Sequence, residues 1–553
     1  MKASDLFVKC LENEGVTRIF GVPGEENADF MMSLQDSGRI RFVLCRHEQA
    51  AAFMAEVHGR LTGEAGVCLG TLGPGATNLI TGVADSNMDN APLVVITGQA
   101  DSKRQHKESH QAMDVVAMFK PVTKWSQGVW HPNNIPEIVR KAFKLATAEK
   151  PGACHIELAE DIAETHLAAE LQPLPARRVR RPVTDDKVVN EAWELIRSAR
   201  RPIIIAGNGA IRKRASKQLR RLAEATGIGV ASTFMAKGCV DMDAPQCLYT
   251  IGLQARDHVT HAIDASDLVI CIGYDMVEYH PRLWNAKSQH KLINIDFVPA
   301  EVDADYKVDV DLVGDVAHTL WMLNERVALL PQPLKLDLGY QAAARRAMQA
   351  ELEEHADDDT SGTIRPQKVL WDAREVLGRN DILLSDVGAH KMWIARYYHC
   401  YEPNTCLIPN GFCSMGFALP GAISAALVHP ERRILAICGD AGFMMNVQDM
   451  ETARRIGTKI VVMVWVDNAY GLIEWKQDNE FGRHVDLSFG NPDFVKLAEA
   501  FGWNGYRVEK SANLKSTLEA AFASQGPSLI AVPIDYSENK KLTTRLGNIS
   551  CPI

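Results

Sequence analysis

The sequence predicts an α/β protein of three domains, each a mainly parallel sheet covered by helices. Short apolar runs alternate with longer helical patterns along the chain, and this alternation is typical of parallel strands joined by helical crossovers. The length of 553 residues allows several domains, since one domain usually holds about 100–200 residues. Hydrophobic residues make up 46% of the chain and charged residues 23%, which supplies enough apolar material for several cores.

Three blocks carry this alternation, and two proline-bearing stretches separate them. Candidate strands of the first block lie near 18–22, 41–45, 67–72, 92–97 and 153–158. Apolar runs of the later blocks lie at 201–207, 267–273, 292–296, 433–438 and 460–466. The breaks lie at 172–182 and 331–359, and the second ends in an acidic run that we expect to be exposed. The predicted domains are therefore 1–170, 185–335 and 360–553.

Charge and composition argue against several classes of protein. A net charge of −9 disfavours a nucleic-acid partner, because such proteins usually carry a basic face. The first residues show no basic region followed by an apolar core, so we expect no secretory signal. No apolar run approaches the ~20 residues that a membrane span needs. The twelve cysteines form no Cys-x-x-Cys pair, which favours reduced thiols over disulfides or zinc. We therefore expect a cytoplasmic protein without nucleic-acid or membrane partners.

A carboxylate and an amide follow two predicted strands of the third block. Asp440 comes directly after the run 433–438 and Gly439, and Asn468 comes 28 positions later, after the run 460–466. Neighbouring parallel strands would bring both side chains to the carboxyl edge of one sheet, where open α/β folds bind ligands. Carboxylate, amide and backbone oxygens suit Mg²⁺, and a helix start beyond Gly442 would offer N–H groups to an anion. A strand ending in Gly-Asp also occurs for turn or capping reasons alone.

The first and third blocks hold further candidate residues. Glu48 falls in the first turn of an alanine-rich helix after the strand at 41–45, where it could also serve only to complement the helix dipole. A glycine-rich crossing at 70–78 and polar loops at 97–99 and 110–114 follow other strand ends. Met415 lies among small residues, which leave room for a flat ring, although methionine is usually core filler.

Together these motifs resemble the thiamine diphosphate (ThDP) enzymes, and most closely the catabolic, flavin-independent acetolactate synthases. The matching segments are spread over all three blocks and include 46–55, 73–82, 110–119, 277–285 and 465–468. The resemblance implies ThDP-binding folds in the first and third domains and a Rossmann-like central domain. A lone Gly-x-Gly at 207–209 is weak support for a dinucleotide, and the similarity to the flavin-free branch makes FAD unexpected.

The resemblance also implies residue roles. Glu48 would bond the pyrimidine of ThDP, and Glu48 and Gln111 would be the catalytic residues. Gly24 and Gln111 would line the substrate space. Mg²⁺ would be held by Asp440, Asn468 and the carbonyl of Tyr470. The remaining cofactor contacts would come from Gly411, Cys413, Met415, Gly439, Asp440, Ala441, Gly442, Asn468 and Tyr470. Ala441 stands where the family has glycine, so we expect this turn to avoid a positive φ or to be mildly strained.

The reaction implied is the decarboxylation of pyruvate on ThDP and ligation of the hydroxyethyl unit to a second pyruvate, which gives 2-acetolactate and CO₂. Another ThDP-dependent 2-oxo acid decarboxylase, lyase or carboligase with a different acceptor stays open, because 469–476 departs from the pattern of the catabolic relatives. A non-catalytic protein that keeps the fold is a remote alternative. Groups from the first and third domains meet across a subunit interface in this family, so we expect a homodimer or homotetramer.

Overall fold

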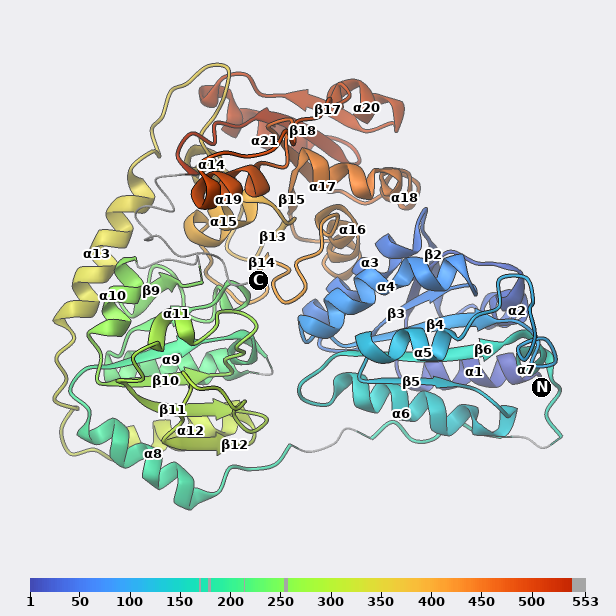
Figure 1. The fold of residues 1–553 in the computed structure, drawn as a ribbon, viewed down its shortest axis with the longest axis horizontal. Helices are drawn as coiled ribbons and strands as arrows, with labels where there is room; N and C mark the ends of the chain where they lie inside the picture. The colour runs from blue at the N-terminus through green and yellow to red at the C-terminus, as the bar shows by residue number, and fades with distance from the viewer. Residues whose placement is uncertain (169–170, 178–180, 213, 253–256, 540–553) are drawn as a thin grey trace.

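Three sheets, each of six parallel strands, make up the protein, in agreement with the predicted α/β class. The computed structural model describes residues 1–168, 171–177, 181–212, 214–252 and 257–539, so part of the first predicted linker lies outside the described residues. Figure 1 shows the first sheet in blue on one side, the central one in green below, and the third in orange and red above.

The first sheet has the strand order β2-β1-β3-β4-β6-β5. Its strands are β1 (Arg18–Gly21), β2 (Arg41–Leu44), β3 (Gly66–Gly70), β4 (Leu93–Gln99), β5 (Trp125–Gly128) and β6 (Ala153–Ala159). Its helices are α1 (Ala3–Asn13), α2 (Ala28–Ser37), α3 (Glu48–Thr62), α4 (Pro74–Met88), α5 (Val115–Phe119), α6 (Ile135–Thr147) and α7 (Glu160–Glu164). The prediction of a loop at 97–99 is wrong. These residues form the end of β4, where the pairing with β6 continues as far as Gln99 opposite Ala159.

The third sheet repeats the strand order of the first, as β14-β13-β15-β16-β18-β17. Its strands are β13 (Ile382–Ser385), β14 (Cys406–Leu407), β15 (Ile434–Gly439), β16 (Val461–Val466), β17 (Asn504–Arg507) and β18 (Ser528–Pro533). Its helices are α14 (Pro366–Val376), α15 (Ala389–Tyr397), α16 (Ala418–Val428), α17 (Asp440–Met445), α18 (Met450–Ile456), α19 (Gly471–Phe481), α20 (Phe494–Ala500) and α21 (Leu514–Ala523). The two sheets therefore share one topology.

The central sheet has the order β12-β11-β10-β7-β8-β9. Its strands are β7 (Pro202–Ala206), β8 (Val230–Ser232), β9 (Cys247–Thr250), β10 (Leu268–Ile272), β11 (Lys291–Asp296) and β12 (Val310–Val313). The helices are α8 (Asp186–Ser198), α9 (Ala215–Thr226), α10 (His258–Asp264), α11 (Arg282–Asn285), α12 (Val316–Ala328) and α13 (Gly339–Glu353). Helix α13 lies within the stretch predicted as the second linker, so that linker is not a bare loop.

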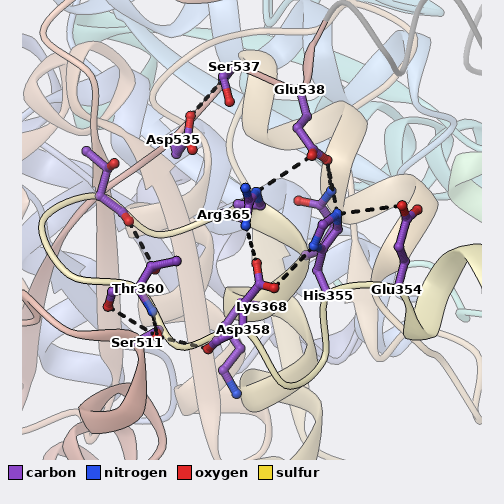
Figure 2. Close-up of polar contacts among 12 residues, drawn as sticks. Glu354, His355, Asp358, Thr360, Arg365, Lys368, Ser511, Asp535, Ser537 and Glu538 are labelled. Carbon is purple, nitrogen blue, oxygen red and sulfur yellow. Dashed lines mark hydrogen bonds and ion pairs between the residues drawn. The ribbon is translucent and has the colours of Figure 1, made fainter.

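The predicted acidic run of this linker is largely exposed, as expected, but some of its side chains also make polar contacts. Figure 2 shows His355 among the carboxylates of Glu354, Asp358 and Glu538, with Arg365 beside the last two. Asp358 accepts from Arg365 at 2.6 Å and lies 3.2 Å from the ring of His355. These contacts fasten the end of the linker to the segment that follows β18.

Two hydrophobic cores join neighbouring domains. One lies between α3 and α4 of the first domain and α16 with one face of the third sheet. In it the rings of Phe53 and Phe417 pack edge to face, with centroids 5.7 Å apart. The other continues from the central domain to the opposite face of the third sheet, where Trp465 is fully buried. Both faces of the third sheet are therefore covered, which accounts for the unbroken apolar runs of β15 and β16.

The described cysteines are free thiols, and all but the half-buried Cys413 are buried. Across the described ranges, every helix is too short or too polar to traverse a lipid bilayer.

Candidate functional site

Asp440 and Asn468 lie at the carboxyl ends of two paired strands. Gly439, the last residue of β15, pairs with Trp465 near the end of β16, so the predicted adjacency of these strands is confirmed. Oδ2 of Asp440 accepts from the backbone N–H of Asn468 at 2.8 Å and from that of Asp467 at 3.2 Å. Burial, reinforced by the negative charge of Asp440, raises the pKa of Asp467 to about 7.

A residue that the sequence analysis missed links the two side chains. The amide Nδ2 of Asn491 lies 2.7 Å from Oδ2 of Asp440 and 2.9 Å from Oδ1 of Asn468. Both oxygens therefore converge on one hydrogen-bond donor. Carboxylate and amide oxygens that converge in this way also fit a small hard cation. The carbonyl of Tyr470, the third predicted ligand, accepts from the backbone N–H groups of Ile473 at 2.8 Å and Glu474 at 3.2 Å, so a cation there would compete with these two bonds.

The turn after β15 is helical from Asp440 onward, so the helix begins before Gly442 and not beyond it as the sequence predicts. Ala441 lies inside α17 and has no positive φ, hence its side chain brings no strain. Gly442 must be small for a different reason: a Cβ there would lie 2.9 Å from Oδ1 of Asp386. Asp386 follows β13 just as Asp440 follows β15.

The segment 410–418 is fixed from two sides. Asp386 accepts from the backbone N–H groups of Gly416 and Ala418 at 2.9 and 3.1 Å, which fixes the backbone directly after Met415. Burial raises the pKa of Asp386 to about 6. From the first domain, Asp89 accepts from the N–H of Gly411 at 2.6 Å.

Cys413 occupies a strained position in this loop. Its φ is +61°, in the left-handed region that favours glycine. Its Sγ lies 3.0 Å from the Asn410 carbonyl oxygen and 3.0 Å from the ammonium of Lys391. These two contacts hold the thiol in place and offset part of the backbone strain.

Glu48 is the first residue of α3, as predicted, and its carboxylate is largely buried. The imidazole of His47 caps the helix by accepting from the N–H of Gln49 at 3.1 Å. Oε2 of Glu48 accepts from the side-chain amide of Asn78 at 2.9 Å. Oε1 faces Gly75, where an added Cβ would lie 3.4 Å away. The absence of a side chain at Gly75 therefore leaves room for another group to approach this oxygen.

The two predicted substrate residues lie at the same edge of the first sheet as Glu48. Gln111, with a φ of +57°, lies over Gly73, where a Cβ would be 3.0 Å from the Gln111 side chain. Gly24 packs against Thr71, and a Cβ at position 24 would come within 2.5 Å of it. Both therefore contact the 70–78 crossing that carries Asn78, the partner of Glu48.

Within one chain, the first domain contacts the third domain beside Glu48, beyond the end of α17. The backbone N–H of Arg46 donates to Asp449 at 3.0 Å, and Asp449 ends the short 3₁₀ turn η6 (Val447–Asp449). Glu48 therefore lies near the far end of α17, whereas Asp440 begins that helix. Among the described residues of the same chain, Asn78 donates to Glu48.

The Gly-x-Gly turn of the central domain is filled by the protein's own groups. The N–H of Asn208 donates to the Glu278 carboxylate at 2.8 Å. A Cβ at Gly207 would lie 2.6 Å from the carbonyl oxygen of Gly273. Burial raises the pKa of Glu278 to about 8. A carboxyl group thus takes the donor that a phosphate would use.

Comparisons with known proteins match all three parts of the chain. Family models of the thiamine pyrophosphate enzymes match the N-terminal TPP binding domain at residues 1–118, the central domain at 189–323, and the C-terminal TPP binding domain at 386–532. The matched residues amount to well over half of the chain, and each match contains one of the three sheets or most of it.

Individual relatives align over nearly the full length. The acetolactate synthase of Bacillus subtilis is 34% identical over 550 residues, which cover 98% of this chain and 95% of the relative. The catabolic acetolactate synthase of Raoultella terrigena is 35% identical over 547 residues, or 98% of this chain and 97% of the relative. A probable acetolactate synthase large subunit of Methanocaldococcus jannaschii is 35% identical over 573 aligned positions, or 100% of this chain and 96% of the relative. The chain therefore belongs to the thiamine pyrophosphate enzymes and, within them, to the acetolactate synthases.

Proposed function

We propose that the protein joins two molecules of pyruvate to give 2-acetolactate and CO₂, with ThDP and Mg²⁺ as cofactors. The observation that carries the proposal is the convergence of Asp440 Oδ2 and Asn468 Oδ1 on the Asn491 amide. It lies at the carboxyl edge of the third sheet, while Glu48 lies at the same edge of a first sheet with identical topology.

Asp440, Asn468 and the carbonyl of Tyr470 would hold Mg²⁺, with the Asn491 amide displaced from the two oxygens it now bridges. Backbone groups of Gly439, Ala441 and Gly442 would approach the diphosphate that the cation neutralises. When bound, ThDP supplies a thiazolium carbon nucleophile and a cationic ring that accepts the electrons released with CO₂.

The residues of the first domain would handle the proton and the substrate. Glu48, held by Asn78 through Oε2, keeps Oε1 toward the crossing at Gly75, where it can exchange a proton with a pyrimidine nitrogen. Gln111 and Gly24 would line the space for the 2-oxo acid. Met415, which directly precedes the backbone that Asp386 holds, would support the bent coenzyme, and Gly411 and Cys413 would meet the pyrimidine through their backbone.

A complete site needs two subunits. Because Glu48 and Asp440 lie toward opposite ends of α17 in one chain, we assign Glu48 of one subunit to the coenzyme that Asp440 of another subunit anchors. The functional unit is therefore a homodimer, and a homotetramer would pair two of them. We also propose domain limits of 1–170, 185–335 and 360–553, a cytoplasmic location and no bound FAD, the last because Glu278 occupies the glycine turn of the central sheet.

A pyruvate assay with ThDP and Mg²⁺ tests this function. Mass spectrometry of the products should find 2-acetolactate and CO₂ from pyruvate alone. Acetaldehyde would instead point to a simple decarboxylase, and a product that forms only with another 2-oxo acid or aldehyde would point to a different acceptor. The absence of ThDP binding in calorimetry would contradict the proposal, and flavin absorption of the purified protein would contradict the exclusion of FAD.

A further inference from the structure

Three carboxyl groups come together where the three domains meet. Glu56 belongs to α3, Asp85 to α4, and Asp89 is the cap of α4. Their oxygens lie within 4.8 Å of one another, and their exposed fractions are 0%, 0% and 1%. The guanidinium of Arg60 lies 3.2 Å from Asp89 and 3.8 Å from Glu56. Even with the more distant ammonium of Lys391, whose charge opposes the rise in the pKa of Asp89, the cations do not balance three buried carboxylates, and uncompensated buried charge is strongly unfavourable.

The unbalanced charge falls on one pair of side chains. Both carboxyl oxygens of Glu56 and Oδ2 of Asp85 have no hydrogen-bond donor among the residues that the structure describes. Burial, with the charges of Asp85 and Asp89, raises the pKa of Glu56 well above its usual range, and burial raises the pKa of Asp85 to about 8. A proton on Glu56 supplies the missing donor toward Asp85 and removes one of the buried charges.

The other oxygens of the cluster hold the loop that precedes α16. Asp89 accepts from the N–H groups of Gly411 at 2.6 Å and Asn410 at 3.2 Å. Asp85 accepts from the N–H of Ser414 at 3.1 Å. The loop fits closely on α4, since a Cβ at Gly411 would lie 2.6 Å from the carbonyl oxygen of Met88.

The same cluster is tied to the central domain and to the strand before the loop. The side-chain amide of Asn208 donates to the backbone carbonyl of Asp89 at 2.9 Å. Arg60 donates to the carbonyl of Ile408 at 3.3 Å. The position of Asp89 is therefore set by groups from all three domains, and the loop follows it.

We propose that Asp85 and Asp89 are positioning residues that hold the loop 410–414 ready for the coenzyme, and that Glu56 carries the proton that makes this possible. This inference rests on the proposed function, in which Gly411, Cys413 and Met415 contact ThDP. Asp89 stays ionised against Arg60 and two backbone donors, while Glu56 acts as a neutral acid that donates to Asp85.

Amide and alanine variants of Glu56 separate a neutral donor from an ionised carboxylate. Glu56→Gln keeps a donor of the same shape without charge, so the ThDP concentration for half-maximal activity should stay within about twofold of the wild type. Glu56→Ala removes the donor and should raise that concentration by about tenfold or more. Asp89→Asn should also raise the ThDP concentration for half-maximal activity, and its kcat at saturating ThDP should change less than that concentration does. A Glu56→Gln enzyme as impaired as Glu56→Ala, or an unchanged Asp89→Asn enzyme, would overturn the proposal.

Hydrogen exchange of the cofactor-free protein tests the loop directly. The amides of Gly411 and Ser414 should be protected in the wild type and in Glu56→Gln, and should exchange faster in Glu56→Ala and Asp89→Asn. Equal exchange in all four proteins would refute the positioning role, whether or not the enzyme makes acetolactate. A bound divalent ion is the alternative to a proton as the balance for the three carboxylates. Elemental analysis of the wild type and of Glu56→Gln tests this alternative. A tightly held divalent ion in the wild type that is lost in Glu56→Gln would overturn the assignment of a proton to Glu56.

Discussion

The side-chain amide of Asn78 donates to Oε2 of Glu48 at 2.9 Å. The two residues lie near the starts of α4 and α3, helices that pack against each other. Because the amide engages one carboxyl oxygen, the carboxylate has a defined orientation before any ligand binds. This is the arrangement that a proton-exchanging carboxylate needs.

Replacement of that carboxylate should separate binding from proton transfer. In Glu48→Gln the Asn78 contact can be kept, so ThDP should still bind in calorimetry. The amide cannot exchange a proton with the pyrimidine, and general acid–base catalysis usually contributes about 10²–10⁴-fold. Exchange of the coenzyme C2 proton with deuterium, followed by NMR, should slow by that factor. Unchanged exchange would refute the role of Glu48.

Asn491→Ala should destabilise the metal-free protein more than the loaded one. The amide now donates to Asp440 and Asn468, and loss of a hydrogen bond to a charged group costs about 1.5–3 kcal/mol. With Mg²⁺ and ThDP bound, the cation would take over both oxygens under the proposed function, and the difference should shrink. Thermal unfolding with and without the cofactors measures it. A large loss of Mg²⁺ affinity would instead make Asn491 a ligand.

Glu157 should make stability depend on pH. Burial raises the pKa of Glu157 to about 7, opposed by a hydrogen bond from Gln99. A carboxyl group whose folded pKa is raised binds its proton more tightly in the folded state, so its contribution is full below pH ~4.5 and is lost as the pH rises through ~7. Relative to Glu157→Gln, the wild type should lose up to about 3 kcal/mol over that range. Denaturant unfolding at pH 5 and pH 8 tests this, and parallel changes in both proteins would contradict it.

Phe417→Ala should weaken the core that joins the first and third domains. Phe417 is fully buried and packs edge to face on Phe53, and such truncations cost about 3–5 kcal/mol. The exposed Val302 provides a matched control, since Val302→Ala should change stability by less than about 0.5 kcal/mol. Equal unfolding midpoints for the two variants would show that this packing contributes little.

The sequence predicted the buried strands well because their apolar runs are unbroken and end at polar or glycine residues. β7, β10, β11, β15 and β16 all fall on predicted runs. Short or outer strands such as β5, with the sequence Trp-Ser-Gln-Gly, escaped prediction because they are brief or half-exposed and show no apolar period. Residues 97–99 were misassigned because Thr97, Gly98 and Gln99 are typical of loops, although the pairing with β6 continues through them.

Candidate residues were easiest to predict at strand ends. Asp440 and Asn468 follow apolar runs directly, whereas Asn491 lies in a polar segment beyond α19 and reaches them only through the fold. Asp386 follows β13 and could have been found by the rule that identified Asp440. Glu56, Asp85 and Asp89 lie within or at the end of helices, and no spacing in the sequence reveals that they converge.

Subunit mixing tests most directly whether Glu48 of one chain serves the coenzyme anchored by Asp440 of another. Glu48→Ala and Asp440→Ala proteins should each be inactive. Co-expressed in equal amounts, they should regain about one quarter of wild-type activity, because half of the dimers are hybrids and each hybrid has one intact site. If both residues served the same chain's coenzyme, every site would keep one defect and the mixture would stay inactive.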